Sequence, residues 1–400
     1  MANYGHHTSK RVIIIGAGVM GLGIGWQLAK AGCIVSIYER GEAGREASWA
    51  AGGMLAPLSE AHFEERALLQ LGIQSCRLYP AWVEELEADS KMAVGYRREG
   101  TLIVAVDRDD AAELKHHYES QRLLGLNVDW LTGAEAREME PLLSPKISAA
   151  VSSPDDHQVD NRAMLNALIT AYRKADGLLH ENTPVKKIEI QSGVATGVWV
   201  EEGLDKADAV VLAAGCWSNQ LGGLPERIKP PVRPVKGQML ALQMEAGSTL
   251  HKVIRVPRSK YRTHTYLVPK SNGRLIIGAT SEEMGFDKRL TAGGLFELLR
   301  GAWEAVPVIY ELPVLETWAG LRPGSRDNAP ILGKTGIENL IIATGHYRNG
   351  ISLVPITAKA IAALILTGET SEVIAPFQLS RFEKNSREQR AMSGEPSSPQ

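Results

Sequence analysis

Cysteine is scarce in this chain of 400 residues, which contains only Cys33, Cys76 and Cys216. The three lie far apart in the sequence, so they provide neither a disulfide framework nor a CxxC pair for a metal or for redox chemistry. The sequence also lacks an HExxH metal motif, a GxSxG nucleophile elbow and any cluster of closely spaced histidines. We therefore expect no metal site, and we expect the protein in the reducing cytoplasm.

The chain also lacks a large excess of charge of either sign, because it contains 44 Lys and Arg residues and 46 Asp and Glu residues. Without a basic excess, neither nucleic acid nor an anionic membrane is an expected partner. Residues 1–10 are polar and do not resemble a secretory signal, and the apolar stretch 12–29 contains five glycines, so no stable membrane insertion is expected. A small neutral or zwitterionic ligand fits this composition better.

The most informative stretch that is present is residues 11–40, RVIIIGAGVMGLGIGWQLAKAGCIVSIYER. The β-branched run at 12–15 predicts a strand buried on both faces of a parallel sheet. A helix with apolar residues at helical spacing follows, and the second apolar run at 34–38 predicts the next strand. That strand ends at Glu39, where an acidic side chain can accept hydrogen bonds from a ribose.

Three glycines join the first strand to the helix, and each meets a different physical need. Gly16 permits the tight turn, Gly18 lets a pyrophosphate approach the backbone, and Gly21 allows the helix to pack closely on the strand. The phosphates would then lie at the positive end of the helix. The stretch predicts a dinucleotide site, with NAD as open as FAD on these residues alone.

The remaining chain alternates helical patterns with short apolar runs. Helices are expected at 64–89, 110–124, 134–139, 161–174, 291–305 and 353–366. Strands are expected at 100–106, 185–190, 194–200, 208–215, 261–270, 274–280, 311–319 and 339–343, with a further strand within the proline-rich segment that starts at 229. The last residues, 384–400, are polar and without an apolar period, so we expect a disordered tail.

Several segments together carry a resemblance to a known family. They are GAGVMG with Glu39, REASWAAGGML at 45–55, VVLAAGCWS at 210–218, PVKGQML at 234–240, YLVPKSNGRLIIGAT at 266–280, WAGLRPGSRDNAPILG at 318–333 and ATGHYRNGISLVP at 343–355. The chain resembles the FAD-dependent amine and D-amino-acid oxidases over residues 11–383, and most closely the glycine oxidases of thiamin biosynthesis. On this resemblance the dinucleotide is FAD.

The resemblance implies an α/β, Rossmann-like FAD-binding domain that is discontinuous in sequence, beside an α+β substrate domain with a large antiparallel sheet. We assign 1–91, 151–228 and 324–383 to the first, and 92–150 and 229–323 to the second. Sarcosine oxidases of this superfamily attach flavin to a cysteine shortly after the region that matches 318–327, and none stands there. Bound FAD is therefore expected to be non-covalent.

Carried over position by position, the resemblance also implies a set of cofactor contacts. Residues 47–54 should line the flavin side, Val185 should lie near the adenine half, and 345–350 should face the pyrimidine end of the flavin ring. A helix beginning soon after Gly350 would offer backbone donors and a positive dipole there. The expected cofactor residues are Gly16, Gly18, Val19, Met20, Gly21, Glu39, Arg40, Ser48, Gly53, Met54, Val185, Gly215, Gly345, His346, Arg348, Asn349, Gly350 and Ile351.

A carboxylate substrate needs a cation, and Arg322 in WAGLRPG is the one that the resemblance selects. Its planar fork can hold a carboxylate through two hydrogen bonds, which lysine cannot do. Tyr266 is expected to add a phenolic donor, and Arg348 a neighbouring charge, although a structural role near the flavin is equally open for Arg348. His264 alternates with Tyr266 on one strand face and is either a substrate contact or an ordinary strand residue. Ser281 should affect the width of the pocket.

The resulting functional hypothesis is the FAD-dependent oxidation of glycine and other small amines, such as sarcosine and small D-amino acids. Hydride would pass from Cα to flavin, and O2 would be reduced to hydrogen peroxide. By resemblance, the imine product feeds a thiazole synthase and the protein is a homo-oligomer, a tetramer. Two alternatives stay open: a D-amino-acid dehydrogenase that passes electrons to a quinone, and a non-catalytic flavin-binding subunit.

Overall fold

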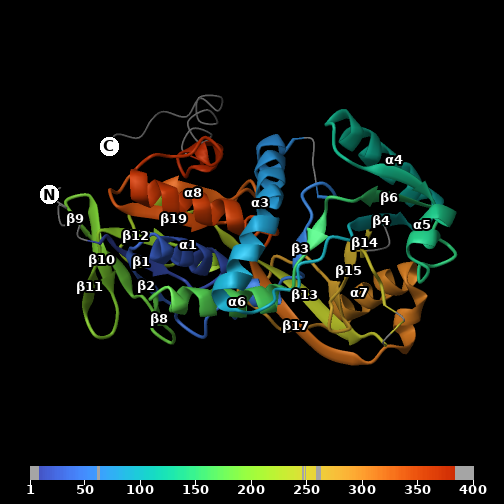
Figure 1. Cartoon of the computed structure of the whole chain (residues 1–400), viewed down its shortest axis with the longest axis horizontal. Helices are drawn as coiled ribbons and strands as arrows, with labels where there is room; N and C mark the ends of the chain where they lie inside the picture. The colour runs from blue at the N-terminus through green and yellow to red at the C-terminus, as the bar shows by residue number, and fades with distance from the viewer. Residues whose placement is uncertain (1–8, 61–63, 246, 248, 258–262, 383–400) are drawn as a thin grey trace.

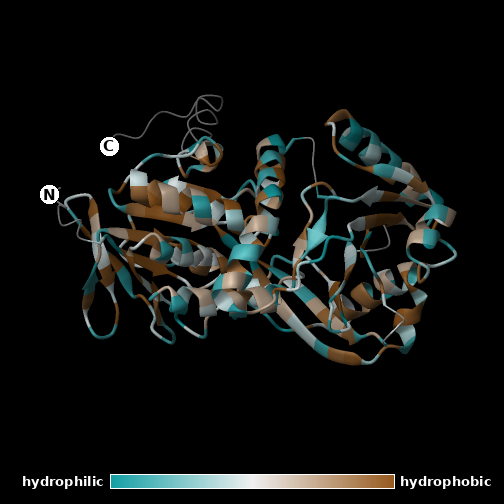
Figure 2. Ribbon diagram, in the orientation of Figure 1, coloured by the Kyte–Doolittle hydropathy of each residue, from teal (hydrophilic) through white to brown (hydrophobic). Residues whose placement is uncertain are grey.

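The computed structural model of the chain describes residues 9–60, 64–245, 247, 249–257 and 263–382 (Figure 1). Its two large sheets lie side by side, one toward each end of the longest axis. Strands of both sheets are mainly hydrophobic, whereas the outer helix α4 is largely hydrophilic (Figure 2). The expected tail at 384–400 lies outside the described residues. Within those residues, no helix is both long and apolar enough to cross a membrane.

The first sheet has six strands in the order β18-β19-β12-β1-β2-β8. Its strands are β1 (Arg11–Ile15), β2 (Ile34–Tyr38), β8 (Leu178–His180), β12 (Ala209–Leu212), β18 (Ile331–Lys334) and β19 (Leu340–Thr344). All neighbours are parallel except β18 and β19. The sheet therefore joins three distant parts of the chain, as the family resemblance implies.

Both faces of this sheet are covered, which explains why β1 is apolar at nearly every position. Val12 and Ile14 pack in the core formed with helices α1 (Val19–Lys30), α3 (Arg66–Ser90), α6 (Asn161–Lys174) and α8 (Val354–Thr367). Ile13 and Ile15 pack on the opposite side. That side is covered by a three-stranded sheet of β9 (Lys187–Gln191), β10 (Val194–Trp199) and β11 (Leu204–Lys206). Alternate residues of one short strand thus serve two cores.

The second sheet has eight strands in the order β17-β13-β16-β15-β14-β4-β6-β5. They are β4 (Thr101–Ala105), β5 (Asp129–Thr132), β6 (Ala149–Ser153), β13 (Arg233–Gln243), β14 (Val253–Val256), β15 (Thr265–Pro269), β16 (Arg274–Gly278) and β17 (Val314–Gly324). It is mostly antiparallel, with one parallel pair, β14 and β4. Helices α5 (Gly133–Met139) and α7 (Ala292–Ala305) pack on one face, and α4 (Arg108–Leu123) packs on the other.

Shorter elements connect the two sheets. They are α2 (Ala47–Ala50), the pair of β3 (Met54–Leu55) and β7 (His157–Gln158), and the 3-10 turns η1 (Gly215–Trp217), η2 (Glu226–Ile228), η3 (Pro307–Glu311) and η4 (Ala375–Phe377). A third group of buried residues, including Met239, Tyr266 and Trp318, covers the face of the second sheet that meets α2. This face, and not the face under α7, is turned toward the first sheet.

Most expected helices and strands are present, and the differences concern length and boundaries. β17 runs on to Gly324, so Arg322 lies within a strand and not after one. β6 spans 149–153 in the second sheet, so the expected division after residue 150 falls inside a strand. β3, β5, β6, β7, β8, β11, β14 and β18 were not expected. Each has only two to five residues, too few to show a clear period.

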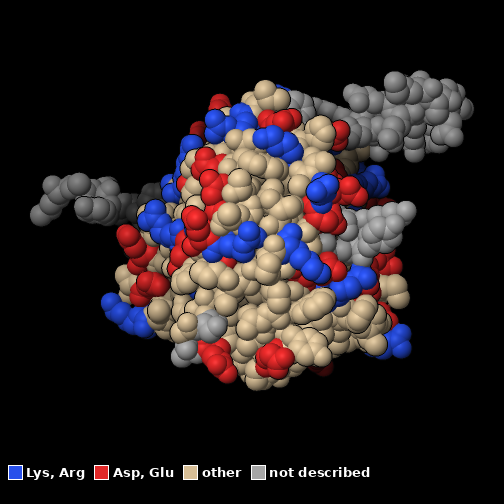
Figure 3. Space-filling view, turned by 90° about the vertical axis from the view of Figure 1, so that its right-hand side faces the viewer, with Lys and Arg blue, Asp and Glu red and all other residues tan. Residues whose placement is uncertain are grey.

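The surface at the end formed by the second sheet carries basic and acidic side chains side by side (Figure 3). No single sign of charge gathers on this face, and much of its lower part is uncharged. The distribution agrees with the balanced composition of the sequence.

Candidate active site

A cavity of about 890 Å³ is lined by residues from both sheets. One end lies at the turn between β1 and α1, where Gly16 and Gly18 line it. The other end is lined by Tyr266 on β15 and by Arg322 on β17. A cavity of this size is within the usual range for cofactor and ligand sites, roughly 300–1,000 Å³.

The turn between β1 and α1 has the backbone geometry that the three glycines predict. Gly16 has φ +106°, and a Cβ atom there would lie 2.6 Å from the carbonyl oxygen of Ala213. A Cβ atom on Gly21 would lie 1.9 Å from the carbonyl oxygen of Gly16, so only glycine allows the helix to approach this closely. Gly18 caps α1 without a side-chain hydrogen bond of its own and lines the cavity, so the positive end of the helix lies at the cavity.

Two side chains hold this turn in place. The Glu39 carboxylate accepts hydrogen bonds from the backbone N–H of Ala17 at 2.9 Å and from that of Gly41 at 3.2 Å. The Ser48 hydroxyl accepts one from the backbone N–H of Val19 at 3.1 Å. Both side chains also line the cavity. The acid expected at the ribose therefore lies beside the glycine turn, as the motif requires.

Arg40 and the segment after β12 form the wall next to Glu39. The Arg40 guanidinium lies 3.6 Å from the ring centre of Trp217 and pairs with Glu46 at 2.8 Å. Cys216 also lines this wall, and burial raises the pKa of its thiol to about 12. The thiol therefore stays protonated at neutral pH and is a poor nucleophile.

The turn before α8 presents backbone donors to the cavity. α8 begins at Val354, a little later than expected, and residues 351–353 form a turn. In the described part of the chain, the backbone N–H groups of Gly350, Ile351 and Ser352 have no acceptor, and all three residues line the cavity. Free donors at a helix N-terminus suit an electron-rich ligand group.

His346 lies in this turn, but its ring points into the protein. It is 3% exposed, and its Nε2 lies 3.2 Å from the Thr357 hydroxyl. Burial lowers the pKa of His346 to about 3, so the ring is neutral and helps to fix the turn to α8.

At the other end of the cavity, Arg322 is oriented by backbone carbonyls. Its Nη1 donates to the carbonyl oxygen of Thr280 at 3.0 Å and lies 3.5 Å from that of Lys236. Among the described residues Arg322 forms no ion pair, so its charge is available to a ligand. Burial raises the pKa of Tyr266 even though Arg322 opposes the shift, and the phenol therefore stays a hydrogen-bond donor.

A chain of polar contacts beside these two residues joins Glu60, Arg255, His264 and Arg348. Arg255 pairs with Glu60 at 2.8 Å, Arg348 lies 3.5 Å from Glu60, and Arg255 Nη2 lies 3.1 Å from Nε2 of His264. Burial, with Arg255 next, lowers the pKa of His264 to about 3. Burial alone would raise the pKa of Glu60, but Arg255 and Arg348 keep it below its ordinary value. This end of the cavity therefore holds a neutral histidine and an ionised glutamate.

The structure brings most of the expected site residues to one cavity. Its lining includes Gly16, Gly18, Val19, Met20, Glu39, Arg40, Ser48, Gly53, Met54, Val185, Gly215, His264, Tyr266, Ser281, Arg322, His346, Arg348, Asn349, Gly350 and Ile351. Gly21 and Gly345 do not line it. Gly21 acts in helix packing, and Gly345 has φ +73°, which bends the chain after β19.

Two residues of the lining, Glu60 and Arg255, were missed by sequence reasoning. Arg255 could have been found from the sequence, because an arginine inside the apolar run VIRV is unusual in a buried strand and needs a partner. Glu60 could not, since it follows a loop of small residues and its partner Arg255 lies 195 positions away. Within the described residues, no group of three metal-ligating side chains is present.

Comparison with known proteins defines the class of this fold and site. The DAO family, described as FAD dependent oxidoreductase, matches residues 11–364. The chain therefore belongs to the DAO family of FAD-dependent oxidoreductases.

Within that class its relatives include glycine oxidases. The chain is 38% identical over 376 residues to glycine oxidase of Geobacillus kaustophilus, covering 92% of this chain and 96% of that protein. The crystal structure of glycine oxidase from that organism superposes with a TM-score of 0.86 at 37% identity, covering 93% of this chain and 99% of that one. The chain is also 38% identical to the Bifunctional protein ThiO/ThiG of Synechocystis sp., of which it spans 54%.

These matches confirm several expectations drawn from the sequence. The family, the fold class, the cofactor FAD and the class of enzyme, an FAD-dependent amine oxidase, are as predicted. FAD-dependent oxidation of glycine is likewise the function that the relatives support. The roles of individual site residues remain predictions that rest on the geometry described above.

Proposed function

We propose that the cavity binds FAD with its phosphates at the turn between β1 and α1 and its ribose at Glu39. The unpartnered N–H groups of Gly350, Ile351 and Ser352 would hold the electron-rich edge of the flavin ring. The single observation that carries this proposal is the continuity of one cavity from the glycine turn to Arg322. Such a cavity lets one extended cofactor reach both sheets.

FAD is held without a covalent bond in this proposal. The cysteine that lines the cavity, Cys216, is buried and its pKa is raised to about 12, so it is not a reactive thiolate. No cysteine follows the segment at 318–327, where sarcosine oxidases carry theirs. Denaturation should therefore release all of the flavin from the polypeptide.

Glycine is held by its carboxylate at Arg322, with Tyr266 as an additional donor. The Arg322 guanidinium is fixed from one side by the Thr280 carbonyl and keeps its other nitrogens for a ligand. Tyr266 is 8% exposed and its phenol stays protonated. Arg348 contributes positive charge from its position beside Glu60. Together these residues fix the substrate by its carboxylate and leave its Cα free to be placed against the cofactor.

The side chains at the substrate end do not favour proton abstraction from Cα. His264 is neutral but faces Arg255, and Glu60 is held in ion pairs by two arginines. When bound, FAD supplies a hydride acceptor whose electrons pass to O2 to give hydrogen peroxide. The task of the protein is therefore to orient a neutral amine and exclude water, which needs no strong base.

We further propose that the imine product is passed to a thiazole synthase. The support is that a relative carries both functions in one chain, the Bifunctional protein ThiO/ThiG, of which the present chain spans 54%. Assembly into a homo-oligomer, a tetramer by the family resemblance, is part of the same proposal. Size-exclusion chromatography with light scattering, alone and with a thiazole synthase added, would test both points.

The decisive test of the reaction is the anaerobic addition of glycine to the yellow FAD-bound protein. We expect the flavin absorbance to bleach, and hydrogen peroxide to form when air is admitted. If glycine leaves the oxidised spectrum unchanged while another small amine reduces it, the substrate assignment fails. Reduction without peroxide in air would indicate a quinone-linked dehydrogenase, and no reduction by any amine would indicate a non-catalytic flavin protein.

A further inference from the structure

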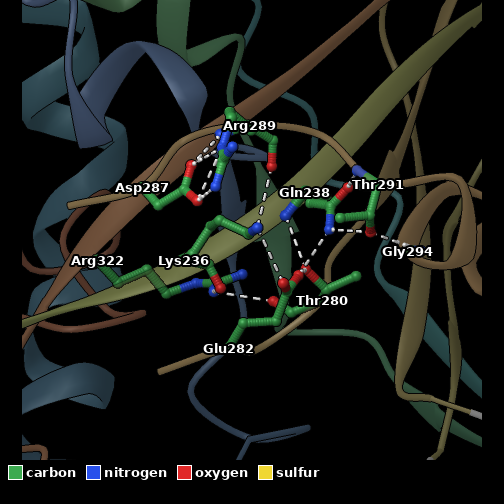
Figure 4. Close-up of polar contacts among 9 residues, drawn as sticks. All are labelled: Lys236, Gln238, Thr280, Glu282, Asp287, Arg289, Thr291, Gly294 and Arg322. Carbon is green, nitrogen blue, oxygen red and sulfur yellow. Dashed lines mark hydrogen bonds and ion pairs between the residues drawn. The ribbon is translucent and has the colours of Figure 1, made fainter. Parts of the chain in front are cut away.

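A buried lysine lies under the substrate end of the cavity without lining it. Lys236 on β13 is 1% exposed, and its ammonium group pairs with Glu282 at 3.0 Å and donates to the carbonyl oxygen of Arg289 at 3.0 Å (Figure 4). A lysine this deeply buried must be paired, because an isolated charge in the protein interior is very unfavourable. The buried position of Lys236 in the sheet therefore also fixes the position of its partner, Glu282.

Glu282 connects several segments at once. Its carboxylate accepts a hydrogen bond from Nε2 of Gln238 at 2.8 Å and one from the Thr280 hydroxyl, in addition to the pair with Lys236 (Figure 4). Its backbone also exchanges hydrogen bonds with that of Lys236, at 2.9 and 3.0 Å. Burial alone would raise the pKa of Glu282, but the hydrogen bonds from Thr280, Gln238 and Lys236 keep it below its ordinary value.

This cluster includes both residues whose carbonyl groups orient Arg322. The acceptors of Arg322 Nη1 are the backbone oxygens of Thr280 and Lys236, and the side chains of both residues bind Glu282. Gly237, between the two polar side chains of β13, leaves room for the guanidinium. A Cβ atom on Gly237 would lie 2.5 Å from Arg322 Nη1.

The alternation of side chains along β13 explains why the polar cluster and Arg322 lie on opposite faces of this strand. Lys236 and Gln238 point to the side where Glu282 and Thr291 lie, and Gly237 faces the opposite side, where Arg322 lies. On one face, the segment 236–238 therefore carries a polar network. On the other face, Gly237 has no side chain and leaves room for Arg322. Ser281, which lines the cavity, lies between Thr280 and Glu282 in the sequence.

We propose that the ion pair of Lys236 and Glu282 positions Arg322 for carboxylate binding, so that both act as positioning residues for the substrate although neither lines the cavity. The proposal rests on the proposed role of Arg322 as the carboxylate anchor. Breaking the pair leaves only the backbone hydrogen bonds between Lys236 and Glu282, so the contact between β13 and the segment at 280–282 should loosen and the carbonyls of Lys236 and Thr280 should shift relative to Arg322. The guanidinium then loses its defined orientation, and carboxylate binding weakens while the flavin end of the cavity is unaffected.

Glu282→Gln is the first test, because it removes the charge and nearly keeps the shape. We expect the KM for glycine to rise about tenfold and the Kd of glycolate, a carboxylate without the reacting amine, to rise by a similar factor. The kcat at saturating glycine should stay within about twofold, and FAD should remain bound. If Glu282→Gln alone is unstable, the double variant Lys236→Met with Glu282→Gln replaces it. This double variant also removes the buried positive charge of Lys236, so it should provide a folded protein.

Glu283→Gln is the matched control. Glu283 is the next residue and also forms an ion pair, with Arg233 at 3.0 Å, but its side chain is 60% exposed. In the described part of the chain, no hydrogen bond or ion pair joins its side chain to Lys236 or Thr280. This variant should leave the KM unchanged. An equal rise in KM for Glu283→Gln and Glu282→Gln would overturn the proposal, because the effect would then be a general one of charge.

Combining Glu282→Gln with Arg322→Lys distinguishes this proposal from the proposed function. If Arg322→Lys alone does not change the KM, the anchor assignment itself fails. If Arg322→Lys raises the KM but Glu282→Gln does not, only the positioning role fails. Our inference requires both to raise it, and it requires the double variant to bind glycine about as weakly as Arg322→Lys alone, because Glu282 acts through Arg322.

Discussion

Replacement of Arg322 by lysine tests the substrate end of the site most directly. Lysine keeps a positive charge but cannot form two parallel hydrogen bonds to a carboxylate. The change should therefore cost one charge-assisted hydrogen bond, worth ~1.5–3 kcal/mol, or about 10- to 150-fold in kcat/KM for glycine. The change also removes the Arg322 N–H group that donates a hydrogen bond to the Thr280 carbonyl oxygen at 3.0 Å.

The assay is anaerobic stopped-flow reduction of the bound flavin over a range of glycine concentrations. It separates the apparent Kd from the rate at saturation, so the loss should fall mainly on the Kd. Arg322→Ala should be affected more strongly still, with FAD retained in both variants. An unchanged Kd in Arg322→Lys, or a loss of FAD that accounts for the lower rate, would refute the assignment of Arg322 as anchor.

Three further predictions concern residues that line the cavity or support its glycine turn. Glu60→Gln removes the negative charge beside Arg348, and glycolate should bind about fivefold tighter at low salt, measured by flavin absorbance; weaker binding would contradict this. Gly21→Ala brings a methyl group to within 1.9 Å of the Gly16 carbonyl, so the purified variant should contain little FAD. His264→Asn should leave the apparent pKa values of kcat/KM between pH 5 and 9 unchanged, because the pKa of His264 is lowered to about 3; disappearance of a pKa near 6.5 would contradict it.

The lowered pKa of His264 also predicts how the stability of the protein depends on pH. A histidine in the unfolded chain titrates near pH 6.5, whereas the folded protein keeps this ring neutral down to about pH 3. The unfolded state therefore binds more protons between these values, and the free energy of unfolding falls as the pH is lowered from about 6.5 toward 3. Relative to His264→Asn, the wild-type melting temperature should decline over that range.

The cofactor end of the site could be predicted from the sequence because its determinants are local. Gly16, Gly18, Gly21 and Glu39 lie within one strand, helix and strand unit, and their spacing alone fixes how the backbone turns. The structure shows this unit with β1 and β2 paired in register from Arg11 opposite Ile34 to Ile15 opposite Tyr38. Local sequence was sufficient here.

The substrate end could not be predicted in the same way, because its contacts join distant segments. Glu60 and Arg255 are 195 positions apart, and no local pattern relates them. Arg322 was selected by resemblance, but its position inside β17 and its support by Thr280 depend on how two strands flank β13. Boundaries failed for a related reason: β6 was missed because its pairing partners, β4 and β5, define it more than its own five residues do.

The order of strands in the first sheet has a consequence for the way the chain acquires its cofactor. β1 leaves the ribosome first, but its neighbour β12 follows about 200 residues later, and β19, which completes the parallel core, ends at Thr344. The glycine turn is therefore made early and stays without its sheet until most of the chain is synthesised. A chain ending before β19 and α8 should not retain FAD, so binding of the flavin requires synthesis of the chain through α8, which ends at Thr367.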